Sequence, residues 1–383
     1  MERGAFTREQ HYLDHAATTP VLPAAARAVG AAMERWGNPS AQYSLGQNAH
    51  KELEECRRTV AGVLGCQPEE VVFTSGGTES DNWAILRGAG RRGGHIITTA
   101  VEHSAVLEPV KELAQRGFEV TYLPVDRAGH VRLEDLQAAL REDTVLCSMM
   151  LVNNELGSVQ PVAECAKAAK AFKKDVFFHC DAVQGFLKMP FTPKELGVDA
   201  LSVSGHKLGA PKGIGCLYLK KGVKLPPLIL GGGQESGLRS GTEPLPMIAA
   251  FAAAVEENAQ EQEGARARLA ALRDYAAKAL QENIADLKLL SPGDAPHILA
   301  VTLPGYKSEV VVRFLNGLGV YISSGSACHK GKPSHVYAAL GLPKPWLDGA
   351  LRVSFGHTST KEDVDALVHG LQEAKAMLFT TLS

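Results

Sequence analysis

A lysine and an aspartate close two apolar segments, and their side chains suit one kind of chemistry. Lys207 ends the segment Asp199-Ala-Leu-Ser-Val-Ser-Gly-His-Lys, and Asp181 ends Val176-Phe-Phe-His-Cys-Asp. Pyridoxal 5'-phosphate is bound by such groups, because its aldehyde combines with an amine and its ring nitrogen pairs with a carboxylate. The alternative for Lys207 is a solvated lysine at the end of a strand, which on this segment alone is the commoner outcome.

A third strand end has the composition of a phosphate site. Val71-Val-Phe-Thr runs into Ser-Gly-Gly-Thr-Glu-Ser, which places Gly77 and Thr78 where a helix is expected to begin. Backbone amides at a helix N-terminus bind phosphate, and the Thr78 hydroxyl adds a donor. An ordinary capped turn is the alternative. Neither a Walker A sequence nor a Gly-x-Gly-x-x-Gly fingerprint follows a strand, so a nucleotide site is not indicated.

Two further strand ends carry polar groups of the same kind. His103 follows the apolar run near Ile96, where its ring could lie over a flat cofactor and handle protons, or simply cap the strand. Asn154 closes the run from Val145, where its amide could bind a ligand oxygen or form an Asx turn. Five polar strand ends in one sheet favour a shared ligand site.

Length and composition limit the function further. The 383 residues are enough for two domains, and the net charge of −2 offers no field for nucleic acid or an anionic membrane. No apolar run reaches the length of a membrane span or a signal peptide, so we expect a cytoplasmic protein. Seven scattered cysteines without a Cys-x-x-Cys pair argue against disulfides and structural zinc. His11 and His15 are the weakest candidates for a metal site, and we predict none.

The fold class predicted is α/β. Seven short apolar runs between Val71 and about residue 220 alternate with helical patterns, which predicts a mostly parallel seven-stranded sheet sandwiched by helices. A long helix is expected from Pro246 to Asn283, leading into a smaller α+β domain. We place the large domain at residues 14–258 and the small one at 1–13 and 259–383. Ligands of such sheets bind beyond the carboxyl ends of the strands.

Together these motifs resemble the pyridoxal-phosphate-dependent cysteine desulfurases, which are class V aminotransferases of fold type I. The resemblance spans nearly the whole chain. It rests on Tyr12-Leu-Asp-His-Ala-Ala-Thr-Thr-Pro20, Gly37-Asn-Pro-Ser40, Thr74-Ser-Gly-Gly-Thr-Glu-Ser, Val152-Asn-Asn-Glu-Leu-Gly, Ser204-Gly-His-Lys, Arg239-Ser-Gly-Thr242 and Ser323-Ser-Gly-Ser-Ala-Cys328.

The resemblance implies a role for each matching residue. Lys207 would carry the cofactor and act as a base, Asp181 would pair with the ring nitrogen, and His103 would stack on the ring. Gln184 and Asn154 would bind the phenolic oxygen, and Arg352 the carboxylate of L-cysteine, although a structural ion pair is the alternative for this arginine. The phosphate would be held by Gly77, Thr78, Ser204 and His206, with Thr242 supplied by the other subunit of a homodimer.

Cys328 would take the substrate's sulfur as a persulfide and release alanine. The basic residues His329, Lys330 and Lys332 that follow it should lower the pKa of its thiol. A sulfur acceptor is implied: an iron-sulfur scaffold or a tRNA-thiolation protein, or small thiols alone.

The chain departs from the family's pattern in three places. The segment from Cys328 to Ser334 is about two residues shorter than in the housekeeping iron-sulfur desulfurases, which gives Cys328 less reach. Tyr43 stands where histidine is frequent, and the sequence given ends at Ser383 without a tail. The identity of the acceptor therefore stays open. Selenocysteine lyase or another class V activity is an alternative, and a sulfur-carrier or interaction subunit is an alternative of another class.

Overall fold

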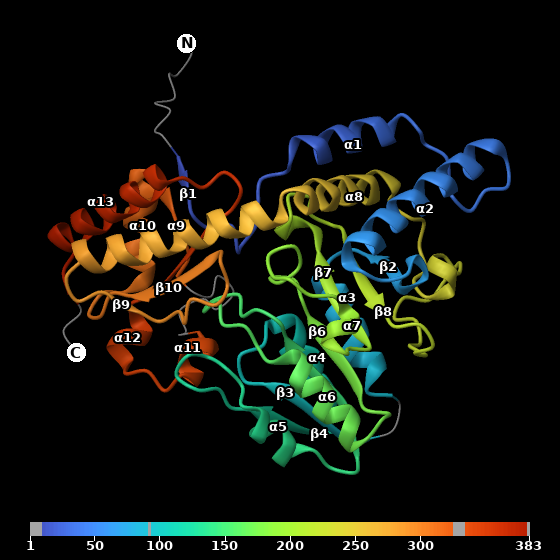
Figure 1. Ribbon diagram of the computed structural model, residues 1–383, viewed down its shortest axis with the longest axis horizontal. Helices are drawn as coiled ribbons and strands as arrows, with labels where there is room; N and C mark the ends of the chain where they lie inside the picture. Colours follow the sequence, from blue (N-terminus) through green and yellow to red (C-terminus); the bar gives the residue numbers. More distant parts are fainter. Residues whose placement is uncertain (1–9, 91–92, 325–333, 381–383) are drawn as a thin grey trace.

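The computed structural model describes residues 10–90, 93–324 and 334–380, and Figure 1 shows the course of the chain. Two units are joined by the helices α8 and α9, which cross the molecule from one to the other. The larger unit is built on a seven-stranded sheet. The smaller one, drawn in orange and red with the N-terminal strand beside it, is built on a three-stranded sheet.

The seven-stranded sheet has the order β2-β8-β7-β6-β5-β3-β4. Its strands β7, β6, β5, β3 and β4 run parallel, and β8 is antiparallel to both neighbours. The predicted mostly parallel sheet is therefore confirmed, and each of the seven apolar runs forms one strand. In chain order they are β2 (Val71–Thr74), β3 (His95–Thr99), β4 (Glu119–Leu123), β5 (Thr144–Met150), β6 (Phe177–Asp181), β7 (Ala200–Ser204) and β8 (Gly215–Leu219).

Helices cover both faces of this sheet. Successive strand residues, such as Ile96 and Ile97 or Phe177 and Phe178, point into two different apolar clusters. One cluster takes side chains from α3 (Gly77–Gly88) and α4 (Ser104–Gln115). The other is built against α1 (Pro23–Met33), α2 (Ser44–Leu64), α5 (Leu133–Ala139), α6 (Val162–Phe172), α7 (Pro193–Leu196) and α8 (Leu245–Gln260). Burial on both faces explains why the strands are apolar without alternation.

The smaller unit has a separate core. Its antiparallel sheet has the order β12-β10-β9, with β9 (Lys288–Leu289), β10 (Ile298–Thr302) and β12 (Ala350–Ser354). A parallel pair joins β1 (His11–Tyr12) to β11 (Val320–Tyr321). The helices of this unit are α9 (Gln262–Asn283), α10 (Ser308–Leu318), α11 (His335–Ala339), α12 (Lys344–Asp348) and α13 (Lys361–Met377).

The helix expected from Pro246 to Asn283 is two helices. α8 ends at Gln260 and α9 begins at Gln262, with Glu261 between them at φ −110° and ψ 4°. No side chain from residue 256 to residue 268 is buried, so packing does not hold the backbone in one continuous helix there. The prediction of one continuous helix rested on helical propensity alone. The break at Glu261 is possible because water can solvate the backbone of this exposed segment.

Candidate functional site

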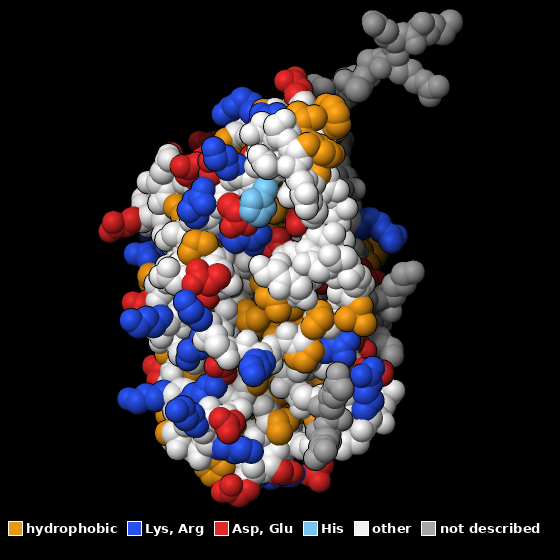
Figure 2. Space-filling model, turned by 90° about the vertical axis from the view of Figure 1, so that its right-hand side faces the viewer, with side chains coloured by type: hydrophobic (Ala, Val, Ile, Leu, Met, Phe, Trp, Pro, Cys, Tyr) orange, Lys and Arg blue, Asp and Glu red, His pale blue; other side chains and the backbone are white. Residues whose placement is uncertain are grey.

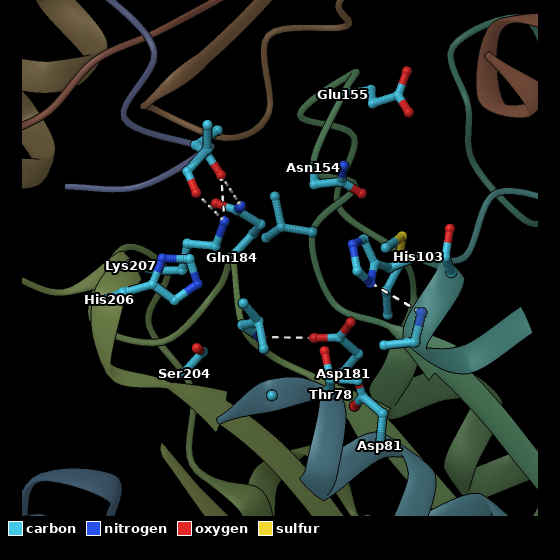
Figure 3. Close-up of a pocket in the computed structure, with 18 of the residues that line it drawn as sticks. Thr78, Asp81, His103, Asn154, Glu155, Asp181, Gln184, Ser204, His206 and Lys207 are labelled. Atoms are coloured by element: carbon cyan, nitrogen blue, oxygen red, sulfur yellow. Dashed lines mark hydrogen bonds between the residues drawn. The ribbon is translucent and has the colours of Figure 1, made fainter. Parts of the chain in front are cut away.

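Ten of the predicted site residues meet in one pocket at the carboxyl ends of the strands. The cavity measures about 300 Å³, a size suited to a small molecule. Figure 3 shows side chains from the ends of β3, β5, β6 and β7 pointing into it. Its lining includes Gly77, Thr78, His103, Asn154, Asp181, Gln184, Ser204, His206, Lys207 and Arg352.

Lys207 reaches across the pocket from the short 3-10 helix η2 (Gly205–Lys207) that follows β7. Its Nζ donates to the backbone oxygens of Ala16 and Ala17, at 2.6 and 2.8 Å. Gln184 Nε2 donates to the same Ala16 oxygen at 2.9 Å. The segment between β1 and α1 thus holds both side chains at the pocket, and an amine in this position is available to a ligand's aldehyde.

Asp181 lies deep in the pocket at the end of β6, with its side chain buried. Its Oδ1 accepts a hydrogen bond from the backbone amide of Val183 at 2.9 Å. Burial raises the pKa of this carboxyl, while the nearby His103 and Lys207 act in the opposite direction. A cationic ligand nitrogen would compensate this desolvated acid.

The turn between β2 and α3 forms an anion cradle. Gly76 has φ +149°, a conformation that side-chain-bearing residues rarely adopt, and α3 begins at the next residue. A Cβ on Gly77 would lie 2.7 Å from Val183 Cγ2, so only glycine fits there. Thr78, Ser204 and His206 lie around this helix N-terminus (Figure 3), and burial lowers the pKa of His206 to about 4. The imidazole is therefore neutral, and the cradle relies on amides and hydroxyls.

His103 is both a cap and a pocket residue. Its Nδ1 accepts a hydrogen bond from the amide of Ala105 at 3.1 Å, so it caps the helix α4, whereas the sequence suggested a cap of the strand. The ring nevertheless lines the pocket (Figure 3), and burial lowers the pKa of the imidazole. Since Nδ1 is an acceptor, the neutral ring carries its proton on Nε2.

The two asparagines after β5 have different surroundings. Asn153 is buried, and its Oδ1 accepts from the amides of Glu155 and Leu156 at 2.9 and 2.8 Å, which is the Asx turn. The Asn154 side chain lines the pocket instead (Figure 3). The Asx turn of Asn153 therefore directs the Asn154 side chain into the pocket.

Arg352 comes from β12, the edge of the smaller sheet, and its side chain is 5 % exposed. Nη1 donates to the backbone oxygen of Asn154 and Nη2 donates to Asp14 Oδ1, both at 2.8 Å. The ion pair considered as the structural alternative therefore exists. Arg352 nevertheless lines the pocket, so the ion pair is compatible both with a structural role and with binding of a substrate's carboxylate.

Two predicted residues are not brought into this pocket by the described chain. Thr242 is exposed in the loop before α8 and does not line the cavity. Cys328, with His329, Lys330 and Lys332, lies outside the described residues. Among those that are described, no group of three or more histidine, cysteine or acidic side chains has the arrangement of a metal site. His11 pairs with Asp363, at 2.9 Å between Nδ1 and Oδ1.

Comparison with known proteins places the chain in a family. The model of the family described as aminotransferase class V matches residues 11–367. The chain belongs to the class V aminotransferase family. Cysteine desulfurase IscS of Dictyoglomus turgidum is 42 % identical over 366 residues, which cover 94 % of this chain and 92 % of that protein.

Solved structures agree with this class V assignment. A structure named NIFS-like protein superimposes with a TM-score of 0.91 at 38 % identity, covering 97 % of this chain and 100 % of that one. A structure titled SspA in complex with cysteine gives 0.79 at 34 % identity, covering 91 % and 100 %. Class V aminotransferases and cysteine desulfurases are pyridoxal 5'-phosphate enzymes, so the predicted family and fold are confirmed.

Two buried acids to which sequence reasoning gave no role are Glu102 and Asp81, of which Asp81 lines the pocket. Glu102 is buried, its Oε1 accepts from Thr99 Oγ1 and the Met150 amide at 2.7 and 2.9 Å, and burial raises its pKa to about 8. Asp81 lies beside Asp181 (Figure 3), and burial followed by the charge of Asp181 raises its pKa. Neighbouring desolvated carboxyls disfavour one another's ionisation. Glu102 stood beside His103 in the sequence, but nothing there signalled its burial.

Proposed function

We propose that this protein is a cysteine desulfurase, which converts L-cysteine to L-alanine and passes the sulfur to Cys328 as a persulfide. The observation that carries the proposal is the meeting of Lys207 and the buried Asp181 in one pocket of a chain whose relatives bear that name. No helix in the described parts of the chain is both long and apolar enough to cross a membrane.

The pocket fits pyridoxal 5'-phosphate. Asp181 is a buried acid that has no cationic hydrogen-bond partner among the described residues, as a site for a ring nitrogen requires. The glycine turn before α3, with Thr78, Ser204 and His206, suits the phosphate, and Gln184 and Asn154 would hold the phenolic oxygen. When bound, this cofactor supplies an electron sink for the substrate's α-carbon. Lys207 would hold it covalently.

The chain's own groups would then handle protons and orient the substrate. The Lys207 amine, once released by the substrate's amine, would take the proton from the α-carbon. His103 lies over the pocket with its Nε2 protonated and would stack on the ring. The guanidinium of Arg352 would bind the substrate's carboxylate, since its planar N–H groups match two carboxylate oxygens.

Sulfur transfer needs no external oxidant. The Cys328 thiolate would attack the substrate's Sγ, so that an S–S bond forms as the Cβ–Sγ bond breaks. The bonding electrons stay with the carbon skeleton, which takes up a proton and leaves as alanine. The six cysteines of the described chain are all free thiols. A reducing compartment, such as the cytoplasm, would keep Cys328 in the same state.

A homodimer would complete the site by bringing the partner's Thr242 to the phosphate. Support comes from exposed apolar side chains near the α1–α2 connection and in the loop before α8, where Trp36 is 76 % and Leu230 77 % exposed. This end of the molecule faces the viewer in Figure 2, where hydrophobic side chains gather. Apolar surface of this kind marks an interface. The sulfur acceptor would be a scaffold or tRNA-thiolation protein, or a small thiol.

Incubation of the purified holoenzyme with L-cysteine tests the proposal. Alanine should accumulate, and mass spectrometry should locate one added sulfur atom on the peptide that contains Cys328. Absence of alanine with L-cysteine would contradict the desulfurase function. Alanine formed only from selenocysteine would instead identify a lyase.

Replacement of Cys328 by alanine separates the two halves of the reaction. The variant should bind cofactor and substrate normally but release no alanine, because the sulfur has no thiolate to accept it. Cys56→Ala is the matched control. Burial raises the pKa of Cys56 to about 11, so that its thiol stays protonated and its loss should leave turnover unchanged. Full turnover by Cys328→Ala would refute the persulfide assignment.

A further inference from the structure

Asp14 is a charged side chain next to the pocket, and the proposed chemistry gives it no role. It follows β1 and its carboxylate is 19 % exposed. Its backbone forms a parallel bridge with Ser354, two residues beyond Arg352 in β12. Ser354 also donates its amide to the oxygen of Leu13, at 2.8 Å, and accepts from the amide of His15, at 3.2 Å. The backbone thus fixes Asp14 beside Arg352.

The contacts of Arg352 leave part of its guanidinium for a ligand. The group has five N–H donors. Nη1 donates one N–H to the Asn154 oxygen, and Nη2 donates one to Asp14. Within the described chain, Nε has no hydrogen-bond partner. Three N–H groups therefore remain, enough for a bidentate contact with a carboxylate without release of Asp14.

Asp14 also supplies the charge that Arg352 needs when no substrate is bound. A buried guanidinium without a counter-ion would be strongly destabilising, and Asp14 provides the only acidic partner that the structure gives it among the described residues. Burial raises the pKa of the Asp14 carboxyl, and the nearby charges of Arg352 and Lys207 oppose that rise. Asp14 therefore lies within the electrostatic reach of both cations of the pocket.

We propose that Asp14 is a positioning residue for recognition of the substrate's α-carboxylate, which acts by holding the Arg352 guanidinium at the pocket wall. The inference rests on the proposed role of Arg352 in binding an amino acid. It predicts that Asp14 affects substrate affinity through the orientation of Arg352, and that the chemical step is little affected.

Three variants of the holoenzyme test this role in turnover of L-cysteine. Asp14→Ala should raise KM by about tenfold or more and leave kcat within about twofold, because an unheld guanidinium binds a carboxylate less well. Asp14→Asn keeps an oxygen that accepts from Nη2, so it should restore most of the affinity. Asp199→Asn removes a buried partner of Lys170 at the opposite end of β7 and should change neither constant.

Binding of L-alanine provides a readout that needs no turnover. The ligand has the carboxylate and amine of the substrate, and its dissociation constant should rise in Asp14→Ala as KM does. In the double variant Asp14→Ala/Arg352→Ala the loss should equal that of Arg352→Ala alone, because Asp14 acts through the guanidinium. A wild type that binds L-alanine but does not desulfurate cysteine would refute the proposed function and leave this test valid.

Two results would overturn the inference. One is additive loss in the double variant, and the other is a fall in kcat at constant KM for Asp14→Ala. If Asp14→Ala does not fold, Asp14→Ser decides: its shorter side chain cannot keep the 2.8 Å contact with Nη2, so L-alanine affinity should fall by about tenfold, and affinity within about threefold of wild type would contradict positioning.

Discussion

Glu102 is a buried acid that precedes the pocket residue His103, and the fold controls its protonation. It is fully enclosed, and burial raises its pKa from about 4.5 to about 8. The side chain is therefore neutral at physiological pH. Above pH 8 its charge would add to that of the neighbouring Asp181, whose ionised form the cofactor's ring nitrogen requires.

Glu102 should make stability decline as the pH rises from about 5 to 8. The folded protein binds a proton in this range that the unfolded chain has released, so the free energy of unfolding falls with pH. Glu102→Gln is neutral throughout and should lack this contribution. Urea midpoints at both ends of the range measure the difference, with the exposed Glu164→Gln as control. Parallel slopes for wild type and Glu102→Gln would contradict the assignment.

The sequence identified those residues whose chemistry is visible in their type and position. Lys207 and Asp181 end apolar runs, and the topology of a parallel sheet brings such ends together. The pair of Asp14 with Arg352 was not predictable from spacing, because the two residues are 338 positions apart and the bridge of Asp14 with Ser354 brings them together. Burial of Glu102 likewise arises from packing, which no local pattern records.

At the scale of elements, the turn from β2 to α3 depends on the backbone conformation of Gly76. In Gly76→Ala the added Cβ would lie 3.7 Å from Ser204 Oγ, which is an ordinary contact. The backbone of residue 76 has φ +149°, however, and this conformation is strained for alanine. Relaxation of the turn would displace the amides that open α3. We expect cofactor affinity to fall by about tenfold or more.

Titration of the apoprotein with pyridoxal 5'-phosphate, followed by absorbance, measures this effect. Gly264→Ala is the control, because this helical glycine in α9 has no atom near its added Cβ and an ordinary φ. It should leave cofactor affinity unchanged and stabilise the fold by about 0.5–1 kcal/mol. Equal cofactor affinities for both variants would show that the turn's geometry is not required.

The elements themselves followed from hydrophobic pattern wherever burial enforced it. All seven strands were predicted, because each forms an apolar run, and six of them are buried along most of their length, whereas the edge strand β4 is partly exposed. The break at Glu261 was missed, since propensity favours helix on both sides and only the absence of buried contacts permits the interruption.

For the whole molecule, the domain limits of 14–258 for the large domain and of 1–13 with 259–383 for the small one stay a prediction, which two separate cores support. Leu13 and Leu269 belong to the core of the smaller unit, while Ala16 and Val255 belong to that of the larger one. The chain therefore passes from the smaller unit at Leu13 to the pocket at Ala16. Both units contribute to the wall of the pocket, which explains why Asp14 and Arg352 lie close to residues of the large unit.

The proposed sharing of the site between subunits predicts complementation. A heterodimer of Lys207→Ala with Thr242→Ala, isolated with two affinity tags, would contain one site with both residues intact and one with neither. Its activity at limiting cofactor should approach about half that of the wild-type dimer, although both homodimers are impaired. If Thr242 served its own subunit, no site would be intact, and the heterodimer could not exceed half the activity of Thr242→Ala. A wild-type protein that is active as a monomer would contradict the shared site outright.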